Sequence, residues 1–367
     1  MVFKIICYTD VSSLDTKEIT MNIMITGATG FVGTKLVHSL LEEGHTIYPL
    51  VRSAQKKDQI MSSISKEQQS RVHPVIGDIT QQMLGIDPDV QNKLEGKINI
   101  LYHTAAFLSF DPADREKTFF VNVQGTQHAL DLAKSIDIPA FYHISTAYTL
   151  GMQDFGKEEL HSLDRSFVND YEESKSHAEH LVWQEREKLK ISIFRPAIIV
   201  GDSNTGEADT TFALYGLLKA IMLLKKLIIR GRIDSDRSIR LLCNGEASNN
   251  VVPVNYVVDV LTAAALYANP GMIYHIANNH APKNDQVMEW IIDISGVHQL
   301  SLTNNSADLT PEDAVINEPM SVFHSYLSRT VTFDDTNTKE LINQSGKPAL
   351  QLSNEKYQRL IKTFFQS

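Results

Sequence analysis

The chain has 367 residues, of which 43% are apolar, so it can bury a large core in one large domain or in two unequal ones. Its formal net charge is −10 and it has no long basic run, which argues against nucleic acid as the main partner and favours a small molecule. Its two cysteines, Cys7 and Cys243, lack the spacing of a metal site or of a disulfide framework, so we expect no metal and a reducing compartment.

Residues 1–20 precede the first predicted strand, and we assign them to an N-terminal extension. Either this extension is dispensable, since Met21 could itself be a translation start, or it adds a strand. Its apolar beginning, MVFKIICYTD, is too short for the core of a signal peptide and is interrupted by Asp10. The most apolar later stretch, residues 212–229, contains three lysines and falls short of a bilayer crossing. We therefore expect a soluble, cytoplasmic protein without a transmembrane segment.

Short runs rich in Ile, Val and Tyr alternate with helix-length segments from residue 22 to about residue 200. The runs are NIMIT, TIYPLV, HPVIGDI, NILYHTA, FYHIST and ISIFRPAIIV. Such alternation is typical of right-handed crossovers and of a parallel sheet covered on both faces. The sequence therefore predicts an α/β domain with a doubly wound parallel sheet over residues 21–200. His103 and His143 lie within two of these runs, so we expect them to be packed rather than catalytic.

The stretch ITGATGFVGTKL, residues 25–36, places Gly27, Gly30 and Gly33 between the first strand and a helix. A strand that enters a glycine turn and leaves as a helix directs backbone N–H groups and the positive end of the helix dipole at one point, which suits a pyrophosphate. A glycine triplet alone is also found in tight turns that bind nothing. Its position between a strand and a helix favours a dinucleotide here.

The residue that distinguishes NAD from NADP is expected at the end of the second strand, about 20 residues after the glycines. Arg52 stands there in place of the acid that would bind the ribose 2′-hydroxyl of NAD, with Ser53, Lys56 and Lys57 close by. A guanidinium suits a 2′-phosphate, so we predict NADP(H), the alternative being an ordinary surface arginine. Asp78, after the third strand, is either an acceptor for the adenine amino group or the cap of the next turn.

Tyr171 and Lys175 lie four residues apart at the start of a helical pattern, so both project from one face. An ammonium near a phenol favours the phenolate and lowers the phenol pKa from about 10. Tyr171 would then be the acid and Lys175 the group that tunes it, the alternative being an ordinary surface pair. The pair follows the fifth strand, which ends in Ser145 and Thr146 about 25 residues earlier.

These motifs together resemble the short-chain dehydrogenase/reductase superfamily in its extended branch, whose fold is the Rossmann fold. They are TGATGFVG, GDIT, HTAA, the Asn122 of VNVQGT, HISTAY, YEESK and FRPAIIVG, in this order over about residues 22–201. The resemblance implies that the Thr146 hydroxyl lies beside the substrate carbonyl, with Ser145 as the alternative, and that Tyr171 donates the proton. It also implies that Lys175 binds the nicotinamide ribose and that Asn122 supports the network near Lys175. The cofactor-binding residues that it implies are Gly27, Thr29, Gly30, Phe31, Val32, Gly33, Arg52, Asp78, Ile79, Ala105, Ala106, Tyr171, Lys175 and Pro196.

Within this branch, RPAIIVGDSNTGE at 195–207 and NNVVPVNYVVDVLTAAAL at 249–266 resemble the thioester reductase and fatty acyl-CoA reductase group, the male-sterility type. The resemblance implies that NADPH reduces an acyl thioester, carried on coenzyme A or on an acyl carrier protein, to an aldehyde or an alcohol. Asn255 stands where the group has Asp in its Pro-Val-Asp-Tyr-Val segment, which leaves the lower edge of the pocket undefined.

Other members of the extended branch provide alternative functions on the same framework. They include NADP-dependent sugar-nucleotide epimerases or dehydratases, and alcohol dehydrogenases of the hydroxysteroid or flavonoid type. A non-catalytic NADP-sensing regulator is a further alternative, but such proteins commonly lose the Tyr and Lys that this chain keeps at Tyr171 and Lys175.

The regular alternation ends after the sixth strand, and residues 201–367 are predicted to form mostly a smaller, C-terminal substrate-binding cap, with segments near 249–280 returning to the first domain. The apolar helix at 212–229 is either a wall for an acyl chain or an ordinary buried helix. The basic stretch at 225–240 either meets the phosphates of coenzyme A or an acidic carrier protein, or is a solvated helix face. Residues 306–319 are acidic and bounded by proline, which predicts a surface connection. The sequence does not predict an oligomeric state.

Overall fold

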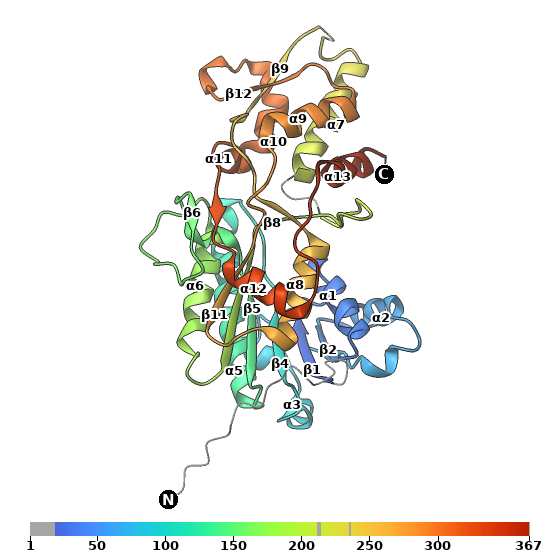
Figure 1. The fold of residues 1–367 in the computed structure, drawn as a ribbon, viewed down its shortest axis with the longest axis vertical. Coiled ribbons are helices and arrows are strands. Elements are labelled where there is room, and N and C mark those ends of the chain that lie inside the picture. Colours follow the sequence, from blue (N-terminus) through green and yellow to red (C-terminus); the bar gives the residue numbers. More distant parts are fainter. Residues whose placement is uncertain (1–18, 211–213, 235, 367) are drawn as a thin grey trace, which may run out of the picture.

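A computed structural model describes residues 19–210, 214–234 and 236–366 of the chain. Figure 1 shows an elongated molecule in which a sheet flanked by helices forms the lower part and a smaller, mostly helical cap lies above it. Most of the predicted N-terminal extension lies outside the described residues, as does Phe212 at the start of the predicted apolar helix.

The central sheet has seven parallel strands in the order β11-β7-β5-β4-β1-β2-β3. These are β1 (Asn22–Thr26), β2 (Thr46–Val51), β3 (Val75–Ile76), β4 (Ile100–His103), β5 (Ala140–Ile144), β7 (Lys190–Pro196) and β11 (Met272–Ile276). The order reverses between β1 and β4, which is where open α/β sheets bind ligands, beyond the carboxyl ends of the strands. The predicted doubly wound parallel sheet is confirmed.

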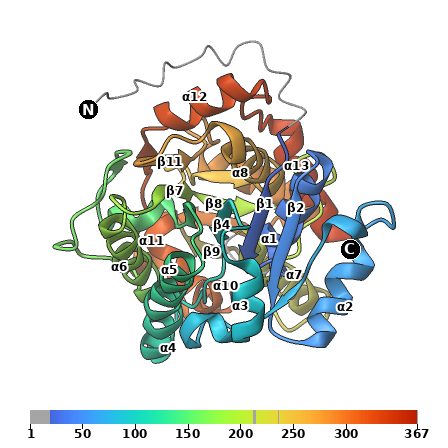
Figure 2. The same ribbon diagram turned by 90° about the horizontal axis from the view of Figure 1, so that it is seen from below.

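Helices cover both faces of the sheet, as Figure 2 shows. They are α1 (Phe31–Glu42), α2 (Ala54–Ser63), α3 (Pro88–Leu94), α4 (Arg115–Phe119), α5 (Gly125–Ser135), α6 (Asp170–Gln184), α8 (Val254–Tyr267) and α12 (Thr336–Ser345). Side chains alternate along each strand, so in β1 Ile23 and Ile25 join the core that contains α1 and α8, while Met24 joins the core that contains α5. Because both faces are covered, the strands are mostly apolar and their few polar residues, such as His103, His143 and Arg195, are buried.

The cap consists of three separate stretches of the chain with a hydrophobic core of their own. The first holds α7 (Leu214–Ile229) and β9 (Ile239–Leu242), the second holds α9 (Asn284–Ser295), β12 (Leu300–Thr303), α10 (Ala314–Met320) and α11 (His324–Leu327), and the third holds α13 (Asn354–Gln366). Strands β9 and β12 pair in parallel. No helix in the described ranges has both the length and the apolar character that crossing a membrane requires.

Between these stretches the chain returns twice to the sheet. In the first return β10 (Val251–Pro253) pairs with β8 (Ile198–Val200), α8 packs on α1, and β11 becomes the edge strand. In the second, which the sequence did not reveal, β13 (Thr332–Phe333) pairs with β6 (Phe155–Gly156), and α12 packs on α8 and β11.

The prediction of a surface connection at 306–319 is wrong for its second half. Helix α10 packs against α7, and its Ile316 and Met320 are buried in the core of the cap. The side chain of Asn317 accepts from Leu242 N at 2.8 Å and donates to Arg240 O at 2.7 Å, so it holds the neighbouring β9. The acidic residues and prolines of the segment led to the wrong prediction. Ile316 and Met320 lie four residues apart, and therefore on one face of the helix.

Candidate active site

The glycine turn between β1 and α1 is packed too closely for side chains. Gly27 has a φ of +69°, and a Cβ on it would lie 2.6 Å from Thr104 Oγ1. A Cβ on Gly33 would lie 2.1 Å from the carbonyl oxygen of Gly27. Gly30 is the N-cap residue of α1, so no side chain covers the first N–H groups of this helix. This cradle of bare backbone fits the pyrophosphate of a dinucleotide.

A cavity of about 570 Å³, here called the central cavity, lies against this turn and extends to the cap. The predicted residues that line it are Gly27, Gly30, Phe31, Val32, Gly33, Ala106, Thr146, Tyr171 and Pro196. Those outside its lining are Thr29, Arg52, Asp78, Ile79, Ala105, Asn122 and Lys175. The structure thus brings the glycine turn and the predicted proton donor to the same space, although 138 residues separate Gly33 from Tyr171 in the sequence.

Tyr171 and Lys175 both project from the first turns of α6, but they have different surroundings. Tyr171 lines the central cavity, whereas Lys175 is buried and its Nζ donates to the carbonyl oxygen of Ile144, at the end of β5, at 2.7 Å. Burial lowers the pKa of Lys175 to about 8, against the opposing effect of Glu179. Lys175 therefore supports the cavity wall from behind.

The expected lowering of the Tyr171 pKa is not what the structure shows. Burial, and secondarily the carboxylate of Glu172, raises the pKa of Tyr171 to about 12. Desolvation disfavours the phenolate. The ammonium of Lys175 donates its hydrogen bond to the backbone at Ile144 O rather than to the phenol oxygen. Tyr171 is consequently a protonated group throughout the neutral pH range, as a proton donor must be.

Two hydroxyl groups lie at the end of β5, in the wall of the central cavity. Thr146 Oγ1 accepts from Tyr148 N at 3.3 Å and caps the short helix that follows, so its own proton remains for another acceptor. Ser145 is 4% exposed, and its Oγ has no hydrogen-bond partner in the described chain. Both hydroxyls can therefore donate to a ligand in the cavity, which keeps Ser145 as the alternative to Thr146.

Asn122 is buried in a π-helical turn, Phe120–Gln124, that interrupts the α4–α5 segment. Its side chain accepts from Phe107 N at 2.7 Å and donates to Phe107 O and to Ser174 Oγ at 2.9 and 3.0 Å. It therefore fixes the loop after β4 to the residue that precedes Lys175, and contacts Lys175 only through this neighbour. Such π turns are frequent at functional sites, and nothing in the spacing of the sequence predicted this one.

The residues predicted near the adenosine end lie outside the lining of the central cavity. Arg52 directly follows β2 and is exposed, and Ser53 caps α2 by accepting from Lys56 N at 3.2 Å. Asp78 Oδ1 accepts from Thr80 N and Thr80 Oγ1, both at 2.9 Å, so it caps the next turn, which was one of its two predicted roles. Ile79 packs on Gly125 of α5.

His103 and His143 are buried in β4 and β5 and their rings stack at 5.6 Å. His103 is hydrogen-bonded to Thr26 and to Thr126, and burial followed by the charge of Lys175 lowers its pKa to about 3. The same two causes hold the pKa of His143 well below its usual value. Both are therefore neutral packed side chains. In the described ranges no three His, Cys, Asp or Glu side chains form a group that could hold a metal ion.

Asn255, in the first turn of α8, holds the turn that follows β8. Its Oδ1 accepts from Ser203 N at 2.9 Å and its Nδ2 donates to Ser203 Oγ at 3.2 Å. This turn leads to Asp209 and Thr210, which line the central cavity. The amide thus supports the lower edge of the pocket, where the family pattern has a carboxylate.

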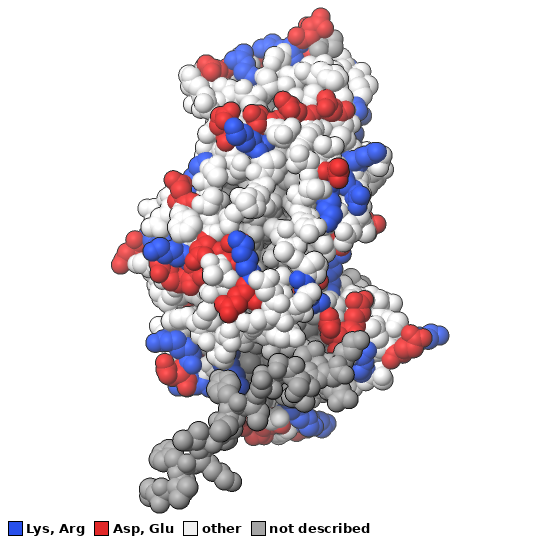
Figure 3. Space-filling view, viewed as in Figure 1, with Lys and Arg blue, Asp and Glu red and all other residues white. Residues whose placement is uncertain are grey.

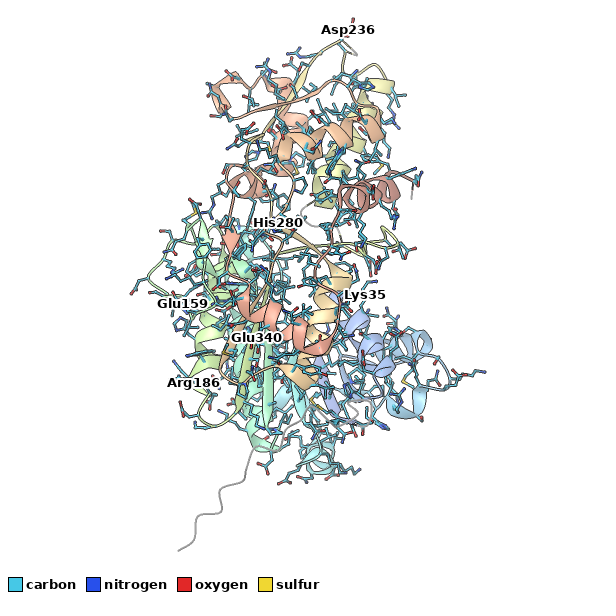
Figure 4. The ribbon with its side chains drawn as sticks, in the orientation of Figure 1. Lys35, Glu159, Arg186, Asp236, His280 and Glu340 are labelled. Carbon is cyan, nitrogen blue, oxygen red and sulfur yellow. The ribbon has the colours of Figure 1, made fainter. Side chains whose placement is uncertain are left out.

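Part of the basic stretch at 225–240 makes contacts within the cap, and Lys226, Arg230 and Arg232 are exposed. Lys225 Nζ donates to Ser295 O at 2.7 Å, and Arg237 pairs with Glu312 at 2.8 Å. Figure 4 places Asp236, within this stretch, at the tip of the cap that is farthest from the sheet. Figure 3 shows positive and negative side chains interspersed over the face in view, without a large patch of one sign. These contacts favour the solvated, structural interpretation.

The sequence missed several residues of the cavity wall. These are Thr104, Leu108, Phe110, Tyr148, Glu172, Phe323 and Tyr326. Glu172 had one signal, because Asn169 and Glu172 have the N-cap and N3 spacing of a capping box, and Asn169 Oδ1 does accept from Glu172 N at 3.0 Å. Phe323 and Tyr326 come from the cap, 150 residues later in the chain, and no local pattern marks them.

The chain is similar in sequence to known proteins. The male sterility protein family matches residues 25–261. A putative fatty acyl-CoA reductase from Drosophila melanogaster is 26% identical in an alignment of 294 residues that covers 65% of this chain and 50% of that protein. Fatty acyl-CoA reductase 1 from Gallus gallus is 28% identical in an alignment of 294 residues that covers 67% of this chain and 55% of that protein. This chain thus spans about half the length of these relatives.

Two solved structures show the shared fold. The terminal R domain from the myxalamid PKS-NRPS biosynthetic pathway superposes with a TM-score of 0.75 and 24% identity, over 95% of this chain and 90% of that one. UDP-glucuronic acid 4-epimerase from Bacillus cereus in complex with NAD superposes with a TM-score of 0.65 and 19% identity, over 94% and 97%.

Proposed function

Because the chain belongs to the male sterility protein family, we propose that it is an NADPH-dependent reductase of acyl thioesters. The observation that carries this proposal is that Tyr171 and Thr146 line the same cavity as the glycine turn, while the buried Lys175 lies one helical turn after Tyr171 and is bonded to the end of β5. The names of the fatty acyl-CoA reductases in fly and chicken support the substrate class. The catalytic roles of these three residues belong to the proposal.

A nicotinamide dinucleotide, when bound, supplies the hydride that reduces the thioester carbonyl carbon. The glycine turn holds the pyrophosphate with backbone N–H groups. Thr146 donates a hydrogen bond to the carbonyl oxygen, where negative charge develops, and Tyr171 gives that oxygen its proton. The buried ammonium of Lys175 stabilises the phenolate that remains. Loss of the thiol then gives the aldehyde.

NADP(H) is the cofactor that we propose, rather than NAD(H). Arg52 is exposed at the carboxyl end of β2, the neighbour of β1 in the sheet, and Ser53 is engaged in capping α2. A guanidinium at this position can form charge-assisted bonds to a 2′-phosphate, and no carboxylate stands there to bind a free ribose 2′-hydroxyl.

The lining of the central cavity favours an acyl substrate over a sugar nucleotide. Leu108, Phe110, Ile199 and Phe323 give it apolar surface that suits an acyl chain and offers a sugar no hydrogen bonds, although Asp209, Thr210 and Tyr326 lie in the same lining. The carrier of the thioester, coenzyme A or an acyl carrier protein, and a cytoplasmic location remain predictions from the sequence.

The test of this function is an assay of NADPH oxidation, followed by the loss of absorbance. It is run separately with acyl-CoAs, with sugar nucleotides and with simple aldehydes. We expect turnover with acyl-CoAs, and Tyr171→Phe should lower it by about 10²- to 10⁴-fold while NADPH still binds, because the proton donor is lost. Tyr267→Phe, at the end of α8, is the matched control and should retain activity. Turnover with sugar nucleotides alone would reject the thioester substrate, and full activity of Tyr171→Phe would remove Tyr171 from the mechanism.

A further inference from the structure

A second, smaller cavity lies inside the cap and is here called the cap cavity. Its volume is about 60 Å³, and its wall is mostly aliphatic, with Leu214 and Leu217 from α7, Met288 and Ile291 from α9, and Met320 from α10. A water-sized group needs about 10–15 Å³ of such space, so about four to six groups of the size of a methylene fit.

The side-chain amides in this wall donate to acceptors within the protein. Asn284 Nδ2 donates to Asn244 O and to Leu327 O, at 2.9 and 3.2 Å, and Asn249 Nδ2 donates to Asn284 Oδ1 at 2.8 Å. These amide donors are therefore bound within the wall. An apolar occupant suits the remaining surface.

The cap cavity and the central cavity share one wall. Ile198, Phe323 and Tyr326 line both of them. The ring of Tyr326 packs edge-on against Tyr148 at 5.1 Å, and Phe110 contacts the rings of Phe323 and Tyr326 at 5.7 and 6.0 Å. Side-chain rings thus form part of the partition between the two spaces, and their size determines how far the central cavity reaches.

The Tyr326 ring is fixed to the helix that carries Tyr171. Its hydroxyl donates to Glu172 Oε1 and accepts from Asn169 Nδ2 at 2.8 Å, and both partners belong to the start of α6. Glu172 is completely buried, and its other oxygen accepts from Val168 N at 3.2 Å. The partition therefore has a defined position relative to the proposed proton donor.

We propose that the cap cavity receives the distal carbons of an acyl chain whose thioester lies in the central cavity, and that the ring of Tyr326 limits the length of that chain. This inference rests on the proposed function. It assigns a space to the part of the substrate farthest from Tyr171, and it makes chain length a property of the partition and of the volume behind it. Each methylene that becomes buried should improve kcat/KM about fourfold, which corresponds to about 0.8 kcal/mol, until the space is full.

A pair of leucines on α7 provides a matched test. Leu217 lines the cap cavity and is 7% exposed, whereas Leu223 on the same helix is 47% exposed. In Leu217→Phe the phenyl ring, which is larger than the leucine side chain, fills part of the cavity. The assay compares kcat/KM for the longest accepted acyl-CoA with kcat/KM for butyryl-CoA, and we expect this ratio to fall at least tenfold. Leu223→Phe should change this ratio less than twofold. A thermal melt checks that each variant is folded.

Variants of Tyr326 test the partition independently of any repacking at Leu217. Tyr326→Ala removes the ring, so the longest accepted acyl-CoA should become longer by at least two carbons. Tyr326→Phe keeps the ring and should retain the wild-type limit. A profile that is unchanged in both Leu217→Phe and Tyr326→Ala would overturn the proposal.

Binding of n-alkanols from octanol to hexadecanol, measured by calorimetry, separates this inference from the proposed function. Their affinity should rise with chain length in the wild type and lose this dependence in Leu217→Phe. If this occurs but no thioester is reduced, the proposed function fails and the assignment of the cavity stands. If thioesters are reduced but neither chain-length profile responds to the variants, the function stands and the assignment is wrong.

Discussion

Replacement of Gly33 by alanine tests the glycine turn directly. The added Cβ would lie 2.1 Å from the carbonyl oxygen of Gly27, whereas an ordinary contact is about 3.5 Å. The start of α1 therefore has to move about 1.4 Å from the turn. Because a misplacement of about 1 Å can reduce the function of a positioned group about 100-fold, we expect the affinity for NADPH to fall by about this factor, or about 2.7 kcal/mol.

A fluorescence titration with NADPH measures this loss, and Gly245→Ala is the control. At Gly245 the added Cβ would lie 3.4 Å from Asp285 Cβ and 3.6 Å from Leu302 Cδ1, which are ordinary contacts, so its affinity should stay within twofold of the wild type. A thermal melt separates lost binding from lost folding. If the Gly33→Ala protein is folded and its affinity for NADPH is within threefold of the wild-type value, the glycine turn does not hold the cofactor as proposed.

Three further predictions follow from the site and its surroundings. Arg52→Ala should reduce the preference in kcat/KM for NADPH over NADH about tenfold, since an exposed charge-assisted contact is lost; an unchanged preference would place Arg52 outside the cofactor site. Burial lowers the pKa of Lys175 to about 8, so its cationic form is lost as the pH rises and kcat/KM should fall through pH 8; Lys175→Arg should shift this fall to higher pH, and a flat profile would contradict the role of the ammonium. Glu179→Ala leaves the buried Arg195 without its carboxylate partner and should lower the free energy of unfolding, measured in urea, by about 3–5 kcal/mol. The control Glu312→Ala breaks an exposed pair and should lower it by about 1 kcal/mol or less. Equal losses would contradict the argument from burial.

The parts of the fold that depend on local spacing could be predicted from the sequence. Alternation of apolar strands and helices predicted the parallel sheet, and the family resemblance is confirmed by the match over residues 25–261. The glycine turn, Thr146 and Tyr171 lie around one cavity because the carboxyl ends of neighbouring parallel strands meet at one edge of the sheet. Their proposed roles await the experiments above.

The remaining features depend on contacts between distant parts of the chain. Tyr326 reaches the central cavity only because α11 of the cap packs over the start of α6. The pKa of Tyr171 rises rather than falls because burial, and secondarily the carboxylate of Glu172, disfavours the phenolate, and burial cannot be read from a spacing of four residues. Helix α10 was missed because the polar and acidic residues at 306–313 precede it in the same segment, while its own apolar pair packs against α7.

The construction of the cap from three separate stretches has a consequence for engineering. A chimera with another substrate range cannot be made by exchanging one contiguous piece, because β11, which belongs to the central sheet, and α12, which packs on β11 and α8, lie between the stretches. A fragment truncated before Met272 would lack the edge strand of that sheet. Diversification of such a scaffold therefore proceeds most readily by point substitutions, with the backbone left intact.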